Sequence, residues 1–420
     1  MDILRRNITG RILEALSDTP VVLLHGARQT GKSTLIQNLV SEKHPAKYAT
    51  LDNVTILAAA RRDPKGLLAE IASPVALDEV QRVPELLLAI KEVVDSNRTS
   101  GRFLLTGSAN VLLLPQLSES LAGRMEILTL WPFSQGELES VHERLIDILF
   151  ADTKLALPMI DLDRADIIQR ILLGGYPESV KRTTTRRRMT WFESYVSTII
   201  QRQVRDIANI EHLTEIPRLF QLLAARIGAL VNVSEISSTL GLPQTTVNRY
   251  LTLLEMMYLV QYLPAWSSHP GKRLVKRSKV FLNDTGLAAY LIGVDEGKIK
   301  QDPTRLGLLL ENFVVMELYK QIGWCEAQVQ MFHFRTRKGQ EVNIVLEDTS
   351  GRLVGIEVKS SSTVNSYDFN GIQYLRSLVG NRFHRGVIFY MGRESIPFGD
   401  GLYALPIGAL WLMVKEGVIV

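Results

Sequence analysis

The sequence contains very little cysteine and no long hydrophobic segment. Cys325 is the one cysteine in 420 residues, so an intramolecular disulfide and a multi-cysteine zinc site are both excluded. No apolar run approaches the ~18 residues that a helix needs to cross a bilayer. The first residues, Met1–Asn7, do not resemble a secretory signal. We therefore expect a cytoplasmic protein without a membrane partner.

The chain also lacks a strong charge of either sign. It has 48 basic and 44 acidic residues and a net charge of +4, so overall charge alone does not predict a nucleic-acid partner. Apolar residues make up 46% and charged residues 22%, which excludes a disordered or low-complexity protein. The length predicts two or three domains. Changes in sequence pattern place them at residues 1–180, 181–300 and 301–420.

Residues 1–180 have the pattern of a parallel α/β sheet. Short apolar runs, each closed by a polar residue, alternate with amphipathic stretches that suit crossover helices. The predicted strands are Val21–Leu24, Tyr48–Asp52, Val75–Asp78, Phe103–Thr106 and Glu126–Leu130.

A phosphate-binding loop lies between the first of these strands and a predicted helix, and residues 26–33 match its eight-position pattern in full. Its glycines let backbone N–H groups surround phosphates, and the helix N-terminus adds a favourable dipole. Lysine supplies a charge for the outer phosphates, and the serine hydroxyl can ligate Mg²⁺. ATP and Mg²⁺ are therefore the predicted cofactors. The predicted binding residues here are Gly26, Ala27, Arg28, Gln29, Thr30, Gly31, Lys32, Ser33 and Thr34.

Two adjacent carboxylates follow at the end of the third predicted strand. Asp78 is expected to hold Mg²⁺ through water, and Glu79 to orient or deprotonate the attacking water, which indicates hydrolysis of the nucleotide. Thr106 or Ser108, at the end of the next strand, is a candidate sensor of the γ-phosphate. Arg124 is a candidate for stabilising transition-state charge, in its own chain or on a neighbouring subunit.

Residues 181–300 are predicted to be mainly helical, with a helix-turn-helix at their centre. Ser234 is expected to cap a short helix that ends at Thr239, and Gly241–Pro243 forms the turn before a helix from Gln244 to about Met257. Side chains at the start of the second helix are of types that bond bases or phosphates. They are Thr245, Thr246, Asn248 and Arg249.

A hairpin is predicted to follow, which makes the unit a winged helix. Its strands are Tyr258–Leu263 and one that begins near Leu274, joined by the polar tip Ser267–Gly271. Basic residues without an intervening acid gather there, a charge pattern that suits DNA phosphates. Those predicted to bind DNA are Lys272, Arg273, Lys276 and Arg277, and Lys279 continues the run. A winged helix that binds a protein is the alternative.

Residues 301–420 are predicted to form a second α/β domain. The predicted elements are a helix at Leu306–Ile322, strands at Met331–Arg335, Glu341–Glu347 and Arg352–Ser360, a helix at Asn370–Val379, and strands at Gly386–Tyr390 and Leu402–Leu405.

The chain resembles the bacterial and archaeal AAA-type (AAA+) ATPases that carry a winged helix and a nuclease-like C-terminal domain of unknown function. The resemblance implies ATP hydrolysis with Lys32, Glu79 and Arg124 as catalytic residues, the last as an arginine finger, in a homo-oligomer such as a hexameric ring. The residues that carry it are 26–33, Leu77–Pro84, Leu105–Ser108, Gly123–Arg124, Gly174–Pro177 and Phe281–Leu287.

The C-terminal segment resembles the PD-(D/E)xK, or restriction-endonuclease-like, fold. The metal-binding and catalytic positions of that fold map onto Glu311, Asn343, Glu357 and Lys359. Members of the fold usually have Asp at the second position, and Asn supplies no charge for Mg²⁺. Glu341 lies two residues away on the same face and is a candidate to compensate. We expect a nuclease-like domain that does not cut.

These features predict an ATP-driven motor or remodeller of duplex or branched DNA, acting by translocation or by branch migration. Two alternatives stay open. One is an ATP-dependent nuclease, which would cut DNA with Mg²⁺. The other is a nucleotide-controlled signalling or defence switch that binds a protein partner.

Overall fold

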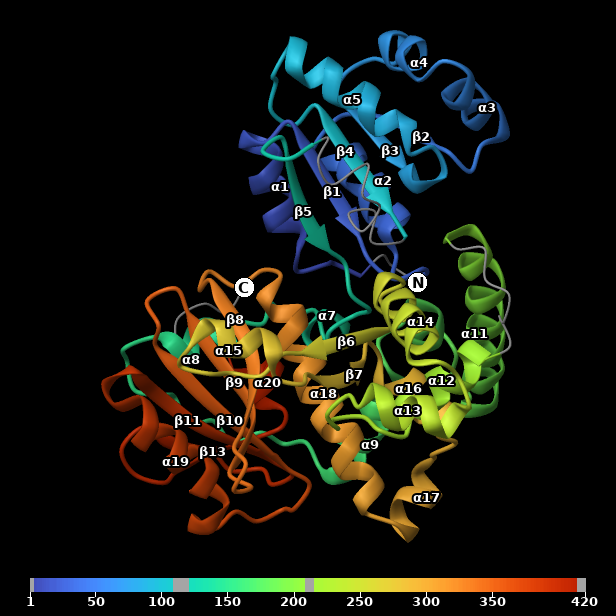
Figure 1. Ribbon diagram of the computed structural model, residues 1–420. Coiled ribbons are helices and arrows are strands. Elements are labelled where there is room, and N and C mark those ends of the chain that lie inside the picture. Colours follow the sequence, from blue (N-terminus) through green and yellow to red (C-terminus); the bar gives the residue numbers. More distant parts are fainter. Residues whose placement is uncertain (1–3, 109–120, 208–214, 414–420) are drawn as a thin grey trace. The chain divides into compact units, whose positions relative to one another are not determined.

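The structure is a computed structural model that describes residues 4–108, 121–207 and 215–413 (Figure 1). The chain forms two compact units. Unit 1 comprises Met1–Pro132 and Met256–Leu259, and unit 2 comprises Phe133–Glu255 and Val260–Val420. Both predicted domain boundaries, at residues 180 and 300, fall inside unit 2, and the division into three domains stays a prediction.

Unit 1 is built on a five-stranded parallel sheet with the strand order β2-β3-β4-β1-β5 (Figure 1). The central strands β1 and β4 are buried along their whole length, which explains why they read as continuous apolar runs. The predicted parallel α/β sheet of a P-loop ATPase is thus confirmed. The strands are β1 (Val21–His25), β2 (Lys47–Thr50), β3 (Val75–Asp78), β4 (Phe103–Gly107) and β5 (Met125–Thr129).

Helices surround this sheet and share one apolar core with it. Leu77 and Leu105 of the strands pack with Leu86 and Ile90 of α5 in that core. Because all five strands are parallel, their carboxyl ends lie at one edge of the sheet, where ligands bind in open α/β folds. The helical elements are α1 (Thr9–Asp18), α2 (Lys32–Glu42), α3 (Val54–Arg62), α4 (Pro64–Glu70), η1 (Val80–Arg82) and α5 (Glu85–Ser96).

The first part of unit 2 is helical, and from residue 181 onward this agrees with the prediction for residues 181–300. The predicted short helix runs from Val233 to Leu240, and its N-cap is Asn232, so Ser234 lies inside the helix and the predicted cap is wrong. Gly241 ends it in the left-handed conformation (φ 69°), which favours glycine. The helices are α7 (Gln135–Leu138), α8 (Leu145–Phe150), α9 (Arg164–Leu173), α10 (Pro177–Val180), α11 (Thr185–Ile207), α12 (Glu215–Ala224), α13 (Val233–Leu240) and α14 (Gln244–Met256).

An antiparallel strand pair follows α14, but its connection differs from the prediction. β6 (Val260–Leu263) pairs with β7 (Lys279–Leu282), and the helix α15 (Pro270–Val275) lies between them. The prediction that the second strand begins near Leu274 is therefore wrong. Proline is favoured at the first position of a helix, and Pro270 occupies that position here, so a residue interpreted as part of a turn starts a helix.

The rest of unit 2 contains a six-stranded mixed sheet with the order β12-β13-β11-β10-β9-β8 (Figure 1). The predicted helices and strands of this region are confirmed, and β12 is an addition. The strands are β8 (Val329–Arg335), β9 (Glu341–Asp348), β10 (Leu353–Lys359), β11 (Phe383–Tyr390), β12 (Ile396–Pro397) and β13 (Leu402–Pro406). The helical elements are α16 (Thr285–Leu291), α17 (Glu296–Gln301), α18 (Thr304–Ile322), η3 (Ser366–Phe369), α19 (Asn370–Val379), η4 (Gly380–Arg382) and α20 (Ala409–Leu412).

Candidate nucleotide-binding site

The loop between β1 and α2 turns tightly, and its two glycines make the turn possible. Gly26 has φ 145° and Gly31 has φ 95°, both in a region that favours glycine. A Cβ atom on Gly26 would lie 2.2 Å from the carbonyl oxygen of Leu130, so only glycine fits beside the chain that follows β5. The loop leads directly into the N-terminus of α2, where backbone N–H groups have no partner within the helix and can bind an anion.

Lys32 is buried at the start of α2 and folds back onto the loop. Its Nζ donates hydrogen bonds to the carbonyl oxygens of Gly26 (3.0 Å) and Ala27 (2.8 Å). Burial lowers the pKa of Lys32 to about 8, although Glu79 and Asp78 act in the opposite direction. A bound phosphate would place a negative charge beside this ammonium. Such a contact with the outer phosphates is the role predicted for Lys32.

Asp78 ends β3 and is held by three hydroxyl groups. Ser33 donates to its Oδ1 at 3.1 Å, Tyr48 donates to its Oδ2 at 2.8 Å, and the Thr106 hydroxyl also donates to Oδ1. The Ser33 hydroxyl and the Asp78 carboxylate are hard oxygen donors side by side, and they fit a Mg²⁺ ion that also binds nucleotide phosphates. The predicted pair of metal-binding residues therefore lies together.

Glu79 is fixed in a strained backbone conformation. Its φ of 62° is left-handed, and its N–H donates to the Thr106 hydroxyl at 3.0 Å. Ser108 donates to Oε1 of Glu79 at 2.8 Å, and the Gln81 side-chain amide donates to Oε2. Strain of this kind is typical of functional sites, where the surrounding contacts maintain it. Glu79 and Ser108 thus meet beside Asp78.

The remaining predicted residues of unit 1 differ in their surroundings. Thr30 is buried, Arg28 is half-buried, and Gln29 and Thr34 are exposed. Arg124 pairs with Asp95 of α5 and donates to the carbonyl oxygen of Ala122, so its described contacts do not include the phosphate-binding loop. Its role as an arginine finger stays a prediction.

Arg6 contributes to the site, and the sequence analysis missed it. Its side chain is buried, with Nη1 donating to the carbonyl oxygen of Thr30 (2.8 Å) and Nη2 to that of Trp131 (2.6 Å). The arginine thereby joins the loop to the segment after β5. No motif surrounds Arg6, so the sequence offers no signal for this role.

His25 is the last residue of β1, directly before the loop. Its ring contacts the hydroxyl of Thr129 at 2.8 Å and the hydroxyl of Tyr258 at 2.5 Å. Burial, and secondly the charge of Lys32, lower the pKa of His25 to about 4, so the imidazole is neutral near pH 7. Tyr258 itself has φ 56°, which is unusual for a tyrosine. The segment Met256–Leu259 is thus bonded to the residue next to the phosphate-binding loop.

Two further motifs that carry the family resemblance meet in unit 2. The N–H of Gly175 donates to Asp284 at 2.6 Å, and Asn283 donates to the Tyr176 hydroxyl at 2.8 Å. A Cβ atom on Gly174 would lie 2.3 Å from the Asp284 carboxylate, so the approach requires glycine. The two motifs Gly174–Pro177 and Phe281–Leu287 therefore contact each other directly, through these hydrogen bonds and this close approach.

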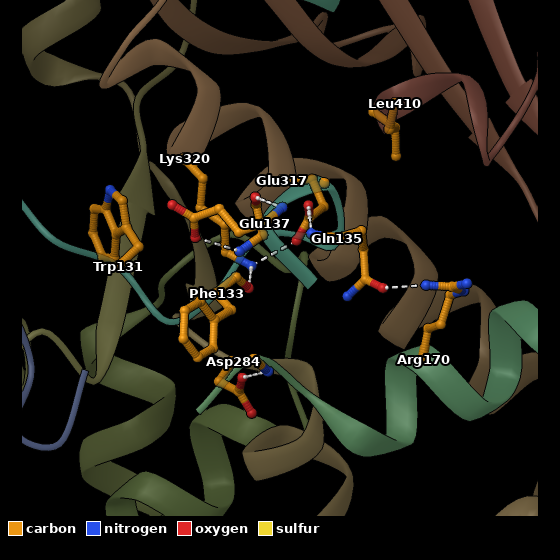
Figure 2. A network of polar contacts seen from close by, with 12 residues as sticks. Trp131, Phe133, Gln135, Glu137, Arg170, Asp284, Glu317, Lys320 and Leu410 are labelled. Atoms are coloured by element: carbon orange, nitrogen blue, oxygen red, sulfur yellow. Dashed lines mark hydrogen bonds and ion pairs between the residues drawn. The ribbon is translucent and has the colours of Figure 1, made fainter. Parts of the chain in front are cut away.

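This pair of motifs belongs to a larger buried network (Figure 2). Phe133 donates its N–H to Gly175 and accepts a bond from Lys320 Nζ at 3.0 Å. Lys320 pairs with Glu317 at 2.5 Å, and Glu317 accepts the N–H of Gln135 at 2.9 Å. The network fixes the first residues of unit 2.

The predicted DNA-binding residues fall into two groups. On α14, Thr246 is half-buried, whereas Thr245, Asn248 and Arg249 are exposed. In the connection between β6 and β7, the exposed residues are Lys272, Lys276 and Arg277.

Two basic residues of the predicted wing are engaged inside unit 2. Arg273 binds Glu347 through both of its terminal nitrogens, at 2.6 and 3.1 Å. Lys279 is buried, and its Nζ lies 2.8 Å from Glu311 and 2.7 Å from Glu341. Lys279 is therefore not part of an exposed basic wing, which corrects the prediction.

The nuclease-like residues lie near one another, and three of the four already have a partner. Asn343 accepts the N–H of Val358 at 3.0 Å, Glu311 pairs with Lys279, and Lys359 lies 3.6 Å from Asp368. Burial raises the pKa of Glu357 to about 8. Within residues 4–108, 121–207 and 215–413, no three His, Cys, Asp or Glu side chains are arranged to hold a metal ion.

The fold and the loop define unit 1 as an AAA-type P-loop ATPase. The AAA domain family matches residues 18–139. Two domains of unknown function match elsewhere, DUF8612 at residues 164–298 and DUF4143 at residues 306–410. No helix in the described part of the chain is long and apolar enough to cross a membrane.

The chain belongs to the same family as the uncharacterized proteins Mb2031c of Mycobacterium bovis and Rv2008c of Mycobacterium tuberculosis. It is 31% identical to each over 404 residues, which cover 96% of this chain and 83% of each relative. An uncharacterized protein of Haemophilus influenzae is 24% identical over 257 residues, 58% of this chain and 57% of that protein.

Solved structures show only distant similarity. A variant of RuvB from Thermotoga maritima has a TM-score of 0.29 and 20% identity, covering 61% of this chain and 89% of that one. A STAND-type signal transduction ATPase from Pyrococcus horikoshii has a TM-score of 0.24 and 13% identity, covering 74% of this chain and 45% of that one. Similarity at this level does not bear on substrates or partners.

Proposed function

We propose that this protein hydrolyses ATP to remodel or move along duplex or branched DNA. The observation that carries the ATPase part is the arrangement at the ends of β1 and β3. There Ser33 contacts Asp78, and Glu79 is held next to Asp78 by Ser108 and Gln81. Lys32 and Ser33 would bind the phosphates and Mg²⁺, and Glu79 would orient the attacking water. Bound Mg²⁺ would neutralise charge on the phosphates during hydrolysis.

The DNA part of the proposal is supported by the elements that follow. Two helices joined by a short turn, α13 and α14, precede the strand pair β6–β7, which is the element order of a winged helix. Exposed polar and basic residues mark the start of α14, among them Thr245, Asn248 and Arg249. These residue types bond phosphates and base edges. Action as a homo-oligomeric ring, with Arg124 reaching a neighbouring subunit, is part of the same proposal.

ATPase assays with DNA of different shapes test this function. We expect hydrolysis by the wild type to rise with single-stranded, duplex or four-way-junction DNA, and the DNA to stay uncut. Lys32→Ala should abolish hydrolysis, since the phosphates lose their lysine. Normal hydrolysis by Lys32→Ala would refute the site. Normal ATPase activity that no DNA stimulates would instead favour a nucleotide-controlled switch with a protein partner.

The nuclease alternative makes a separate prediction. It requires Mg²⁺-dependent cleavage that disappears with Glu357→Ala. The partners already held by Glu311, Asn343 and Lys359 argue against it. We therefore propose that the nuclease-like segment does not cut DNA.

A further inference from the structure

The helix α15 displays apolar side chains at the end of a strand pair. Leu274 is 89% exposed and Val275 is 82% exposed, although leucine and valine are usually buried. Lys272, Lys276 and Arg277 flank them and are also exposed. Within the described part of the chain, none of these three cations forms an ion pair with an acidic side chain.

Arg273 anchors this helix to the rest of unit 2. Arg273 binds the carboxylate of Glu347 through two nitrogens, and its Nε donates to the carbonyl oxygen of Ser267 at 2.7 Å. Its guanidinium also lies over the rings of Phe332 (4.7 Å) and Trp266 (5.7 Å). A planar, bidentate contact of this kind fixes orientation. The apolar pair is therefore held in place rather than left on a loose loop.

The surroundings of the apolar pair select the chemistry of its partner. No acidic residue occurs in the sequence between Glu255 and Asp284, and the exposed cations of this stretch are Lys272, Lys276 and Arg277, so a polyanion is electrostatically favoured at α15. An anionic membrane is disfavoured, because two apolar side chains on one turn bury too little area for stable anchoring. DNA-bending proteins combine cations with small apolar wedges that separate stacked bases.

We propose that α15 is a wedge for DNA, in which Leu274 and Val275 press between stacked bases while Lys272, Lys276 and Arg277 hold the flanking phosphates. The inference rests on the proposed DNA-binding function and gives it a specific contact. It also assigns Arg273 a new role. Arg273 is a positioning residue that holds the wedge, and it does not contact the phosphates.

The test uses the full-length protein and a four-way junction with 2-aminopurine beside the branch point, whose fluorescence rises when the base unstacks. We expect the wild type to raise the fluorescence and Leu274→Ala/Val275→Ala to abolish that rise. The salt dependence of binding should stay unchanged in this variant, because its cations remain. Replacing Lys272, Lys276 and Arg277 by Gln should reduce the slope of log K against log salt concentration by about 0.9 for each cation.

Two controls keep the outcomes distinct. Val54→Ala removes an equally exposed valine from α3 of unit 1 and should leave the fluorescence rise intact. Arg273→Lys keeps the charge but loses the two-nitrogen contact, so it should weaken the rise while the salt slope is retained. Thermal unfolding of each variant confirms that it folds.

Several outcomes would overturn the proposal. A fluorescence rise that survives in Leu274→Ala/Val275→Ala refutes the wedge while DNA binding itself stands. An unchanged salt slope after the three Gln substitutions refutes the phosphate contacts. Failure of the wild type to bind any DNA removes the proposed function as well. Binding to anionic vesicles in place of DNA would assign α15 to a membrane surface.

Discussion

Lys279 offers the sharpest test of the forces that hold unit 2 together. Its side chain is 3% exposed, and its ammonium lies between Glu311 and Glu341, whose side chains are 15% and 32% exposed. Burial alone lowers the pKa of Lys279, but the two carboxylates outweigh it and raise the pKa. Lys279→Met keeps most of the aliphatic volume and removes only the charge. Glu311 then loses this cation, whereas Glu341 keeps Arg335 at 3.7 Å.

The structure sets the size of the effect. Removing one partner of a buried ion pair costs about 3–5 kcal/mol, because the other charge is left buried without compensation. Glu341 is partly solvated, so we expect a value near the lower end, about 3 kcal/mol. Because the entropy of unfolding grows with chain length, in a unit as large as unit 2 this corresponds to a fall in Tm of roughly 5 °C. Differential scanning calorimetry measures it directly.

The sign of the pH dependence gives a second readout. Burial of Glu341 raises its pKa, but the charge of Lys279 outweighs this effect and the pKa of Glu341 is lowered. The ion pair therefore stabilises the wild type above the ordinary glutamate pKa, and this stabilisation is lost as pH falls through the lowered pKa. In Lys279→Met the carboxylates cost free energy only while they are ionised. The difference in unfolding free energy between the two proteins should therefore shrink as pH falls from 7 toward about 4.5.

A matched control separates this buried contact from charge in general. Lys276 is an exposed lysine three residues earlier, and Lys276→Met should change the unfolding free energy by less than about 0.5 kcal/mol. Adding Glu311→Gln to Lys279→Met should restore part of the lost stability, since one uncompensated charge is removed. Equal, small effects of both lysine substitutions would refute the reasoning, as would a loss that does not depend on pH.

The nucleotide site yields three further predictions. The pKa of Lys32 is about 8 without nucleotide, so the affinity for ATP should fall as pH rises through 8. Binding of ATP near this pH should be accompanied by uptake of a proton by Lys32. Calorimetric titration in buffers of different ionisation enthalpy measures that uptake. Glu79→Gln should bind ATP normally but hydrolyse it at least about 100-fold more slowly, and retained hydrolysis would exclude Glu79 as the water-orienting group. Tyr258→Phe removes the hydrogen bond between the segment Met256–Leu259 and His25 beside the phosphate-binding loop. If this bond couples DNA binding to hydrolysis, the variant should lose more of the DNA stimulation of the ATPase than of the basal hydrolysis. Equal reductions of the two rates would count against such a coupling.

The sequence analysis succeeds where one short segment determines the structure. The phosphate-binding loop follows from a local pattern, and the buried parallel strands read directly as apolar runs. Asp78 ends β3, and Ser33 starts the helix after the loop that leaves the carboxyl end of β1, so the two meet at the same edge of the parallel sheet.

The error at Lys279 concerns contacts between distant residues, whereas those at Ser234 and Leu274 are local. Lys279 was interpreted as exposed because it continues a basic run. Its burial depends on Glu311 and Glu341, which are 32 and 62 residues away and approach only in the folded chain. Arg273 belongs to the same basic run, and its partner Glu347 is 74 residues away. A charge pattern gives the sign of a surface but not which of its members are used internally.

The contacts of the phosphate-binding loop indicate how nucleotide binding could act on the rest of the chain. The chain passes from unit 1 to unit 2 after Pro132, and it returns to unit 1 only for Met256–Leu259. Both crossing segments are bonded beside the loop. Arg6 joins Thr30 to Trp131, and His25 binds Tyr258. Phosphates that draw Lys32 away from the loop carbonyls would alter the segment to which Arg6 and His25 are attached. Arg6 and His25 thus connect the phosphate-binding loop, directly or through the adjacent residue, to the two segments that lead into unit 2, and a change in the loop on nucleotide binding would reach both of them.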